Sequence, residues 1–232
     1  MSNGNESATA LIRQLFGPSL GSMLTLENLP PKLQEIECKY LLGTGAKSTR
    51  AHAGFIAKIG SFLEKKRDLP IILSTEFVGV DEYYIIRING TRLTFRLRMG
   101  ANRPLELAVK FAIDQKGNEH RGEISLKISE NKPETVRFLL SVLAHTDPKA
   151  QVFAITQRGI IWHVEDQKGI VEVVCYTVER ANDASDPRVF AELEAIKWKD
   201  AATALSLVHT YETILGLKKQ RCKESIAQLY AP

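Results

Sequence analysis

The chain has 232 residues, of which 44% are hydrophobic and 25% charged, and its formal net charge is +4. These fractions are typical of a globular protein and exclude a chain that is mainly disordered, collagen-like or coiled coil. No apolar run approaches the roughly 20 residues that span a bilayer, and the polar start does not resemble a signal peptide. The three cysteines are scattered and predict neither a disulfide framework nor a zinc site. We therefore expect a cytoplasmic protein without a membrane partner, and so mild a charge does not predict nucleic acid as a partner.

The first part of the chain predicts an extension followed by one folded domain. Residues 1–30 are rich in Asn, Ser, Gly and Pro and predict a loose N-terminal extension, with a short helical segment over 9–16. The folded domain is expected over 31–232. It begins with an extended segment over 34–42 and a helix over 51–66, where apolar residues recur at helical spacing. Alternating apolar and polar residues then predict strands over 71–73, 82–88, 92–98, 105–113 and 121–128.

The second half repeats this pattern loosely. A helix is expected over 133–144, with Pro133 in its first turn. Further strands are expected over 151–157, 160–164, 169–179 and 189–198. A helical tail over 200–229 follows, with Asp200 as its cap and Gly216 ending its first segment. Because most strands are joined by short loops, they are expected to be antiparallel in an α+β fold, and their number allows a closed barrel.

Charges of one sign are grouped by strand. Because successive strand side chains point to opposite faces, Glu35 and Glu37 share a face, as do Arg96 and Arg98. The simplest interpretation of one such strand is a face exposed to water. The grouping favours another one, in which the sheet closes with its apolar face outward and the charges line a lumen. Arginine forks match phosphate oxygens, and paired carboxylates suit Mg²⁺ or Mn²⁺, so the lumen would bind a polyanion with a divalent metal.

The order of these strands resembles the CYTH superfamily, the triphosphate tunnel metalloenzymes. The segment EIECK at 35–39 resembles the family's E-x-E-x-K signature, and RLR at 96–98 resembles its L-R-x-R strand. The segments LAVK at 107–110, RGE at 121–123 and FAELE at 190–194 resemble its later strands. The elements follow the family order and cover about 34–230.

The resemblance implies a closed antiparallel eight-stranded β-barrel, a tunnel, with helices packed outside and a C-terminal helical segment. It implies a metal-dependent phosphohydrolase that acts on inorganic triphosphate or an organic triphosphate, with Mg²⁺ or Mn²⁺ as cofactor. Lys39 would contact phosphate or orient the attacking water. The implied substrate contacts are Arg96, Arg98, Lys110, Arg121 and Arg158. The implied metal ligands are Glu35, Glu37, Glu123, Glu192 and Glu194.

The sequence departs from the family pattern at a few positions, which keeps other functions open. Ser125 stands where the family often has Glu, and Tyr176 stands where an Asp is expected. Glu172 or Glu165 could supply the late acidic residue. The alternatives are a class IV adenylate cyclase, a binding module that holds polyphosphate without turnover, and an α+β domain whose charged faces carry no site. A homodimer also stays open.

Overall fold

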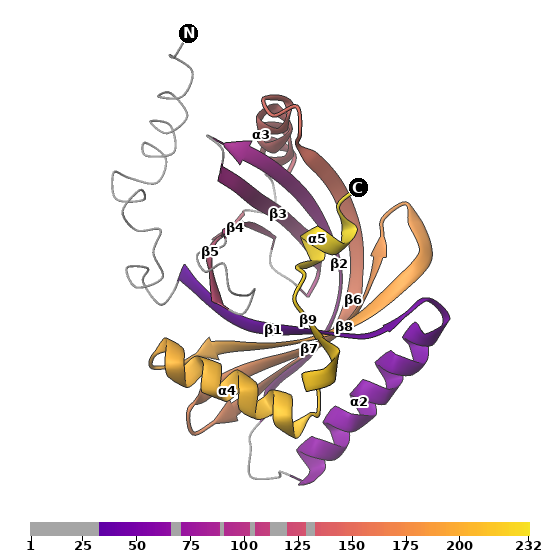
Figure 1. The fold of residues 1–232 in the computed structure, drawn as a ribbon, viewed down its shortest axis with the longest axis vertical. Helices are drawn as coiled ribbons and strands as arrows, with labels where there is room; N and C mark the ends of the chain where they lie inside the picture. The colour runs from indigo at the N-terminus through magenta and orange to yellow at the C-terminus, as the bar shows by residue number, and fades with distance from the viewer. Residues whose placement is uncertain (1–32, 66–70, 89–90, 103–104, 112–119, 129–132) are drawn as a thin grey trace.

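The computed structural model describes residues 33–65, 71–88, 91–102, 105–111, 120–128 and 133–232 (Figure 1). The predicted N-terminal extension with its helical segment lies outside these residues. No helix in the described part is long and apolar enough to cross a membrane.

Eight strands form the body of the protein. They are β1 (Gln34–Thr44), β2 (Ile71–Ile88), β3 (Thr91–Ala101), β4 (Glu106–Phe111), β5 (His120–Lys127), β6 (Gln151–Asp166), β7 (Gly169–Arg180) and β8 (Asp183–Lys197). The other elements are η3 (Gly45–Lys47), α2 (Ser48–Lys65), α3 (Pro133–His145), α4 (Ala201–Ile214), η4 (Lys218–Gln220), the two-residue strand β9 (Arg221–Cys222) and α5 (Ile226–Tyr230).

The eight strands close into a barrel. They are hydrogen-bonded in the order β5-β4-β3-β2-β6-β7-β8-β1, and β1 pairs again with β5. Every pairing is antiparallel. Figure 1 looks into the resulting ring of strands. Beyond the end of β5, the free edge of β1 pairs with β9 at Lys39 and Tyr40. The expected closed antiparallel eight-stranded barrel is confirmed, and closure leaves little unpaired strand edge.

Two pairs of segments that the sequence predicts as separate strands each form one long strand. The segments 71–73 and 82–88 belong to one strand, β2, and 151–157 and 160–164 belong to β6. Gly159, which falls between the two predicted segments, lies within β6. A Cβ atom there would lie 2.2 Å from the carbonyl oxygen of Cys175 on β7. Glycine therefore permits a close approach of the two backbones instead of ending the strand.

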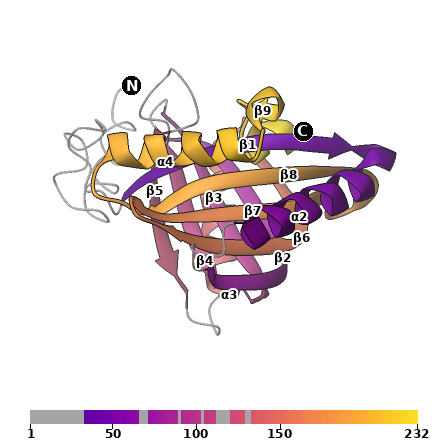
Figure 2. The same ribbon diagram turned by 90° about the horizontal axis from the view of Figure 1, so that it is seen from below.

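The apolar faces of the strands look outward, under the helices. Ile36 and Tyr40 on β1 are fully buried and belong to a core with Phe55 and Ile59 of α2 and Leu207 of α4. Figure 2 shows α2 and α4 running along the outside of the barrel. A separate apolar cluster joins α3 to the outer faces of β2, β3 and β4. Because strand side chains alternate, the opposite faces point into the barrel.

The C-terminal segment is less regular than expected. Asp200 caps α4 by accepting a hydrogen bond from the backbone N–H of Thr203 at 2.8 Å, as the sequence predicts. Gly216 follows with a φ of 57°, which favours glycine, and the helix ends. The predicted tail then continues as η4, β9 and α5 instead of a second long helix. A capping box formed by Ser225 and Gln228 starts the short helix α5.

Candidate functional site

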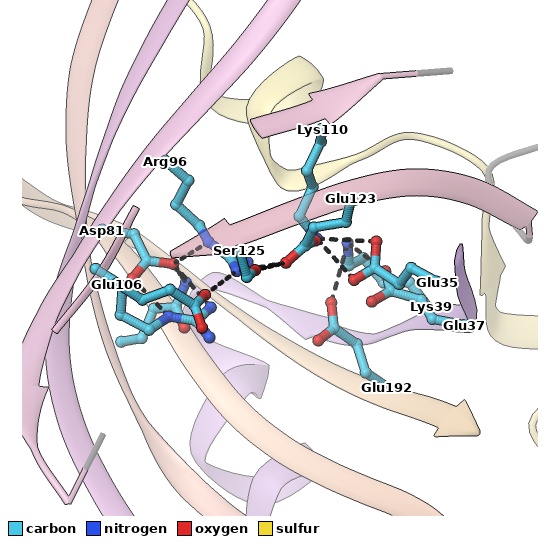
Figure 3. Close-up of polar contacts among 12 residues, drawn as sticks. Glu35, Glu37, Lys39, Asp81, Arg96, Glu106, Lys110, Glu123, Ser125 and Glu192 are labelled. Carbon is cyan, nitrogen blue, oxygen red and sulfur yellow. Dashed lines mark hydrogen bonds and ion pairs between the residues drawn. The ribbon is translucent and has the colours of Figure 1, made fainter. Parts of the chain in front are cut away.

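The inward faces of the strands carry most of the buried charge of the barrel. Strand register places Glu37 opposite Glu194, and Lys39 opposite Glu192, so all four side chains share the inner face. The described acidic and basic side chains that share this face include Glu35, Glu37, Lys39, Asp81, Arg96, Arg98, Glu106, Lys110, Glu123, Glu172, Glu192 and Glu194. Figure 3 shows most of them converging. The lumen is therefore polar and charged, while the outer face is the main core.

Three carboxylates meet at one place in the lumen. Glu35, Glu37 and Glu194 each offer one oxygen, and these atoms all lie within 4.8 Å of one another. Burial, and then the neighbouring carboxylates of Glu35 and Glu172 among others, raise the pKa of Glu194 well above its usual range. Carboxylates crowded in this way are stabilised by a cation. The oxygen donors fit a hard divalent ion such as Mg²⁺ or Mn²⁺.

Lys39 lies beside this trio and is held by two acids. Its Nζ atom lies 3.0 Å from Glu192 Oε1 and 3.5 Å from Glu37 Oε1. Tyr176 donates a hydrogen bond to the same Glu192 oxygen at 2.6 Å. Burial alone would raise the pKa of Glu192, but Lys39, this hydrogen bond and Lys110 lower it to about 2. Glu192 is therefore ionised at neutral pH and pairs with Lys39.

The lowered pKa of Glu192 predicts a loss of stability in acid. A group whose pKa is lower in the folded state stabilises the protein above its unfolded pKa, and this contribution is lost as the pH falls through the folded value. We expect Glu192→Gln to flatten the fall in the free energy of unfolding between pH 4.5 and 2, measured by denaturant titration. Glu64→Gln, on the exposed side of α2, is the control and should retain the wild-type slope. Parallel slopes for wild type and Glu192→Gln would contradict this expectation.

Of the two lumen arginines whose side chains the structure describes, Arg96 is the more enclosed, with 8% of its surface exposed. Its Nη2 atom contacts Glu106 at 3.1 Å and Glu123 at 3.5 Å. Its Nε atom is buried and lies 4.0 Å from Asp81 Oδ2, an ion-pair contact that is too long for a hydrogen bond, and it makes no hydrogen bond with any described residue. A buried donor without an acceptor is costly, so this N–H group points to a ligand that would supply one.

Arg98 and Lys110 lie on either side of Arg96. Arg98 forms a bidentate ion pair with Asp81, in which Nε donates to Oδ1 at 3.0 Å and Nη2 to Oδ2 at 3.1 Å. The side-chain amide of Gln157 also donates to Asp81 Oδ2, at 3.0 Å. Lys110 Nζ lies 2.8 Å from Glu35 and 2.7 Å from Glu123. The basic groups therefore form a chain of ion pairs that reaches from Asp81 to the carboxylate trio (Figure 3).

The structure brings together nine of the eleven residues predicted for the site. They are Glu35, Glu37, Lys39, Arg96, Arg98, Lys110, Glu123, Glu192 and Glu194. Within this group, Glu123 and Glu192 lie outside the trio that could share one metal ion. The side chain of Arg121 lies outside the described part, although its backbone pairs with Glu35.

Arg158 does not lie in the lumen. Its side chain is 69% exposed and pairs with Glu179 at 3.5 Å on the outer surface. The reason is register: Gln157 faces inward on β6, so the next residue must face outward. We therefore leave Arg158 out of the site.

Sequence analysis missed several inward-facing polar residues. Asp81 and Gln157 lie in the middle of strands that the sequence pattern splits, so their alternation was hidden. Glu106 faces inward together with Lys110, as the alternation of the strand predicts, but it was not named as a site residue. Glu172, one of the two candidates for the late acid, also faces inward and pairs with His163 at 2.8 Å. Asp81 forms an ion pair with Arg98 and Glu106 forms one with Arg96, and both arginines were predicted for the site. These contacts cross between neighbouring strands, so they can be recognised only once the strand pairing is known.

One end of the lumen is filled by apolar side chains. Ile226 and Tyr230 of α5 pack with Phe190 and Val178, all of them buried, and Tyr230 donates a hydrogen bond to the carbonyl of Val178. Toward the opposite end, the inward-facing Ser125 and Lys127 of β5 are exposed. These exposed groups of β5 therefore lie away from the apolar residues around α5.

Two solved structures of the S. pombe Pct1 RNA triphosphatase are similar to this chain in a structure search. One is 12% identical with a TM-score of 0.33, and the other, in complex with the Spt5 CTD, is 10% identical with a TM-score of 0.37. Each match covers 95% of this chain and 94% of the other. No protein-family model and no curated protein matches the chain. The functional argument therefore starts from the lumen.

Proposed function

We propose that this protein is a metal-dependent triphosphatase of the CYTH superfamily, which hydrolyses inorganic triphosphate or an organic triphosphate inside the barrel. One observation carries the proposal: a carboxylate trio and a group of buried basic side chains share one enclosed lumen. A triphosphate bound with a divalent ion needs both kinds of group within a few ångströms of each other.

Arg96, Arg98 and Lys110 are the proposed phosphate contacts, with Arg121 as a further one. The Nε atom of Arg96 makes no hydrogen bond with any described residue and lies 4.0 Å from Asp81 Oδ2, so its N–H group can donate to a phosphate oxygen. In the protein alone, the basic groups are held by carboxylates, which keeps them charged and directed into the lumen. The acids of these pairs thus prepare the site for a polyanion.

Glu35, Glu37 and Glu194 would hold the metal ion, because their oxygens are the ones that meet. When bound, Mg²⁺ or Mn²⁺ would neutralise phosphate charge and favour cleavage of the P–O bond. Lys39 lies beside Glu37 and would contact a phosphate or orient the attacking water. Glu123 and Glu192 would hold Lys110 and Lys39 in place.

A substrate panel tests the proposal. Purified protein is incubated with tripolyphosphate, thiamine triphosphate or ATP, each with Mg²⁺ or with Mn²⁺, and the products are identified. We expect orthophosphate from at least one substrate and loss of activity in excess EDTA, because the trio needs a cation. Undiminished hydrolysis in EDTA would contradict the proposal.

The same panel distinguishes the alternatives. Cyclic AMP and pyrophosphate from ATP would identify a cyclase. Tight calorimetric binding of tripolyphosphate without release of phosphate would identify a binding module. Absence of both binding and turnover would leave the charged lumen without a triphosphate function.

A further inference from the structure

Tyr176 is a buried tyrosine at the boundary between the apolar and the charged parts of the lumen. Its side chain belongs to the apolar cluster that contains α5, and its ring stacks on Phe190 at a centroid distance of 5.8 Å. Only 3% of its surface is exposed. The ring is therefore fixed, and its hydroxyl points at the carboxylate of Glu192 (2.6 Å).

The acceptor of this hydrogen bond is shared. Glu192 Oε1 receives the Tyr176 hydroxyl and also lies 3.0 Å from Lys39 Nζ. Lys39 Nζ in turn lies 3.5 Å from Glu37, a member of the carboxylate trio. The fixed hydroxyl of Tyr176 thus restricts the orientation of the Glu192 carboxylate, and this carboxylate restricts the position of the Lys39 ammonium.

Residue type also distinguishes Tyr176 from its surroundings. A neutral phenol is a hydrogen-bond donor and a poor partner for a hard cation compared with the carboxylates nearby. The hydroxyl is directed at Glu192, which lies outside the trio. The Tyr176 side chain therefore adds no charge to the lumen, but it helps to position the charged group of Glu192.

We infer that Tyr176 is a positioning residue for Lys39: its hydroxyl fixes the carboxylate of Glu192, which holds the Lys39 ammonium beside the carboxylate trio. The inference rests on the proposed function, since Lys39 is placed against phosphate or water there. According to this inference, the role of Glu192 is to hold Lys39 and not to bind the metal ion.

A double-mutant cycle tests the inference. Tyr176→Phe keeps the ring and removes only the hydroxyl, and Lys39→Met removes the ammonium at similar length. We expect Tyr176→Phe to lower kcat/KM for tripolyphosphate by about tenfold or more, because it removes a hydrogen bond to a charged group. In the Lys39→Met background the same change should have an effect of about twofold or less. A purely structural role for Tyr176 would give the full loss in both backgrounds and would overturn the inference.

Tyr84→Phe is the matched control. Tyr84 is also buried, and its hydroxyl also donates to a carboxylate, that of Glu82, but on the outer face of the barrel. This variant should keep the wild-type kcat/KM. Mn²⁺ affinity, measured by calorimetry, should be unchanged in Tyr176→Phe, and a large loss would place Glu192 among the metal ligands and overturn the assignment.

The outcome separates the inference from the proposed function. If the wild-type protein binds tripolyphosphate without hydrolysis, triphosphatase activity is wrong, and the cycle is measured on calorimetric affinity with the same expected non-additivity. If the protein hydrolyses tripolyphosphate and the two changes are additive, only the role of Tyr176 is wrong. If it neither binds nor hydrolyses tripolyphosphate, both fall.

Discussion

Glu37→Gln is expected to lower kcat/KM for tripolyphosphate by at least about a hundredfold. The amide keeps the shape of the side chain but removes the charge of one of the three carboxylates that meet in the lumen. It also weakens the contact to Lys39. Both effects act on the same place, since the trio and the ammonium lie side by side. The affinity for Mn²⁺, measured by calorimetry, should fall together with the activity.

The control for this variant is Glu64→Gln. Glu64 lies on the exposed side of α2, outside the barrel, so the same chemical change there should alter neither Mn²⁺ affinity nor turnover. Wild-type Mn²⁺ affinity in Glu37→Gln would show that the trio does not hold the ion. Wild-type affinity with lost turnover would instead point to Lys39 as the affected group.

Arg96→Ala is expected to affect both binding and stability. Removal of a charge-assisted contact to phosphate should weaken tripolyphosphate binding by about tenfold or more. The change also removes the buried partner of Glu106 and one of the two basic partners of Glu123, which keeps Lys110, and breaking a buried pair costs about 3–5 kcal/mol of folding free energy. Calorimetry measures the first effect and denaturant titration the second. A second variant, Arg96→Lys, keeps the charge and tests the loss of the guanidinium fork alone.

Arg158→Ala is the matched control because it removes the same side chain from the outer surface. With 69% of this side chain exposed, we expect tripolyphosphate affinity to stay at the wild-type level and stability to change by less than about 0.5 kcal/mol. An equal loss of affinity in Arg96→Ala and Arg158→Ala would contradict the assignment of the site to the inner face.

The barrel could be predicted from the sequence because its two faces differ so strongly. Along β1, Ile36, Cys38 and Tyr40 are buried against the helices, while Glu35 and Glu37 alternate with them toward the lumen. A period of two therefore assigned each side chain to the correct face. Closure itself depends on the pairing of β1 with β5, which is distant in sequence. The prediction of closure came from strand number and from the family resemblance.

The predictions that were wrong or incomplete concern residues whose position depends on strand register or on the close approach of two backbones. Arg158 and Gln157 are neighbours, and only the pairing of β6 with β2 shows which of them faces inward. Asp81 lies two residues after Gly79, which fits close to the backbone of β3. The pattern around such a glycine resembles a loop, so the acid that holds Arg98 was not found.

The packing of α5 against the inner faces of β7 and β8 divides the interior of the barrel into an apolar and a charged part. The residues around Tyr230 offer a polyanion few partners, because they are almost all apolar. The fold therefore commits only part of its interior to the recognition of charge.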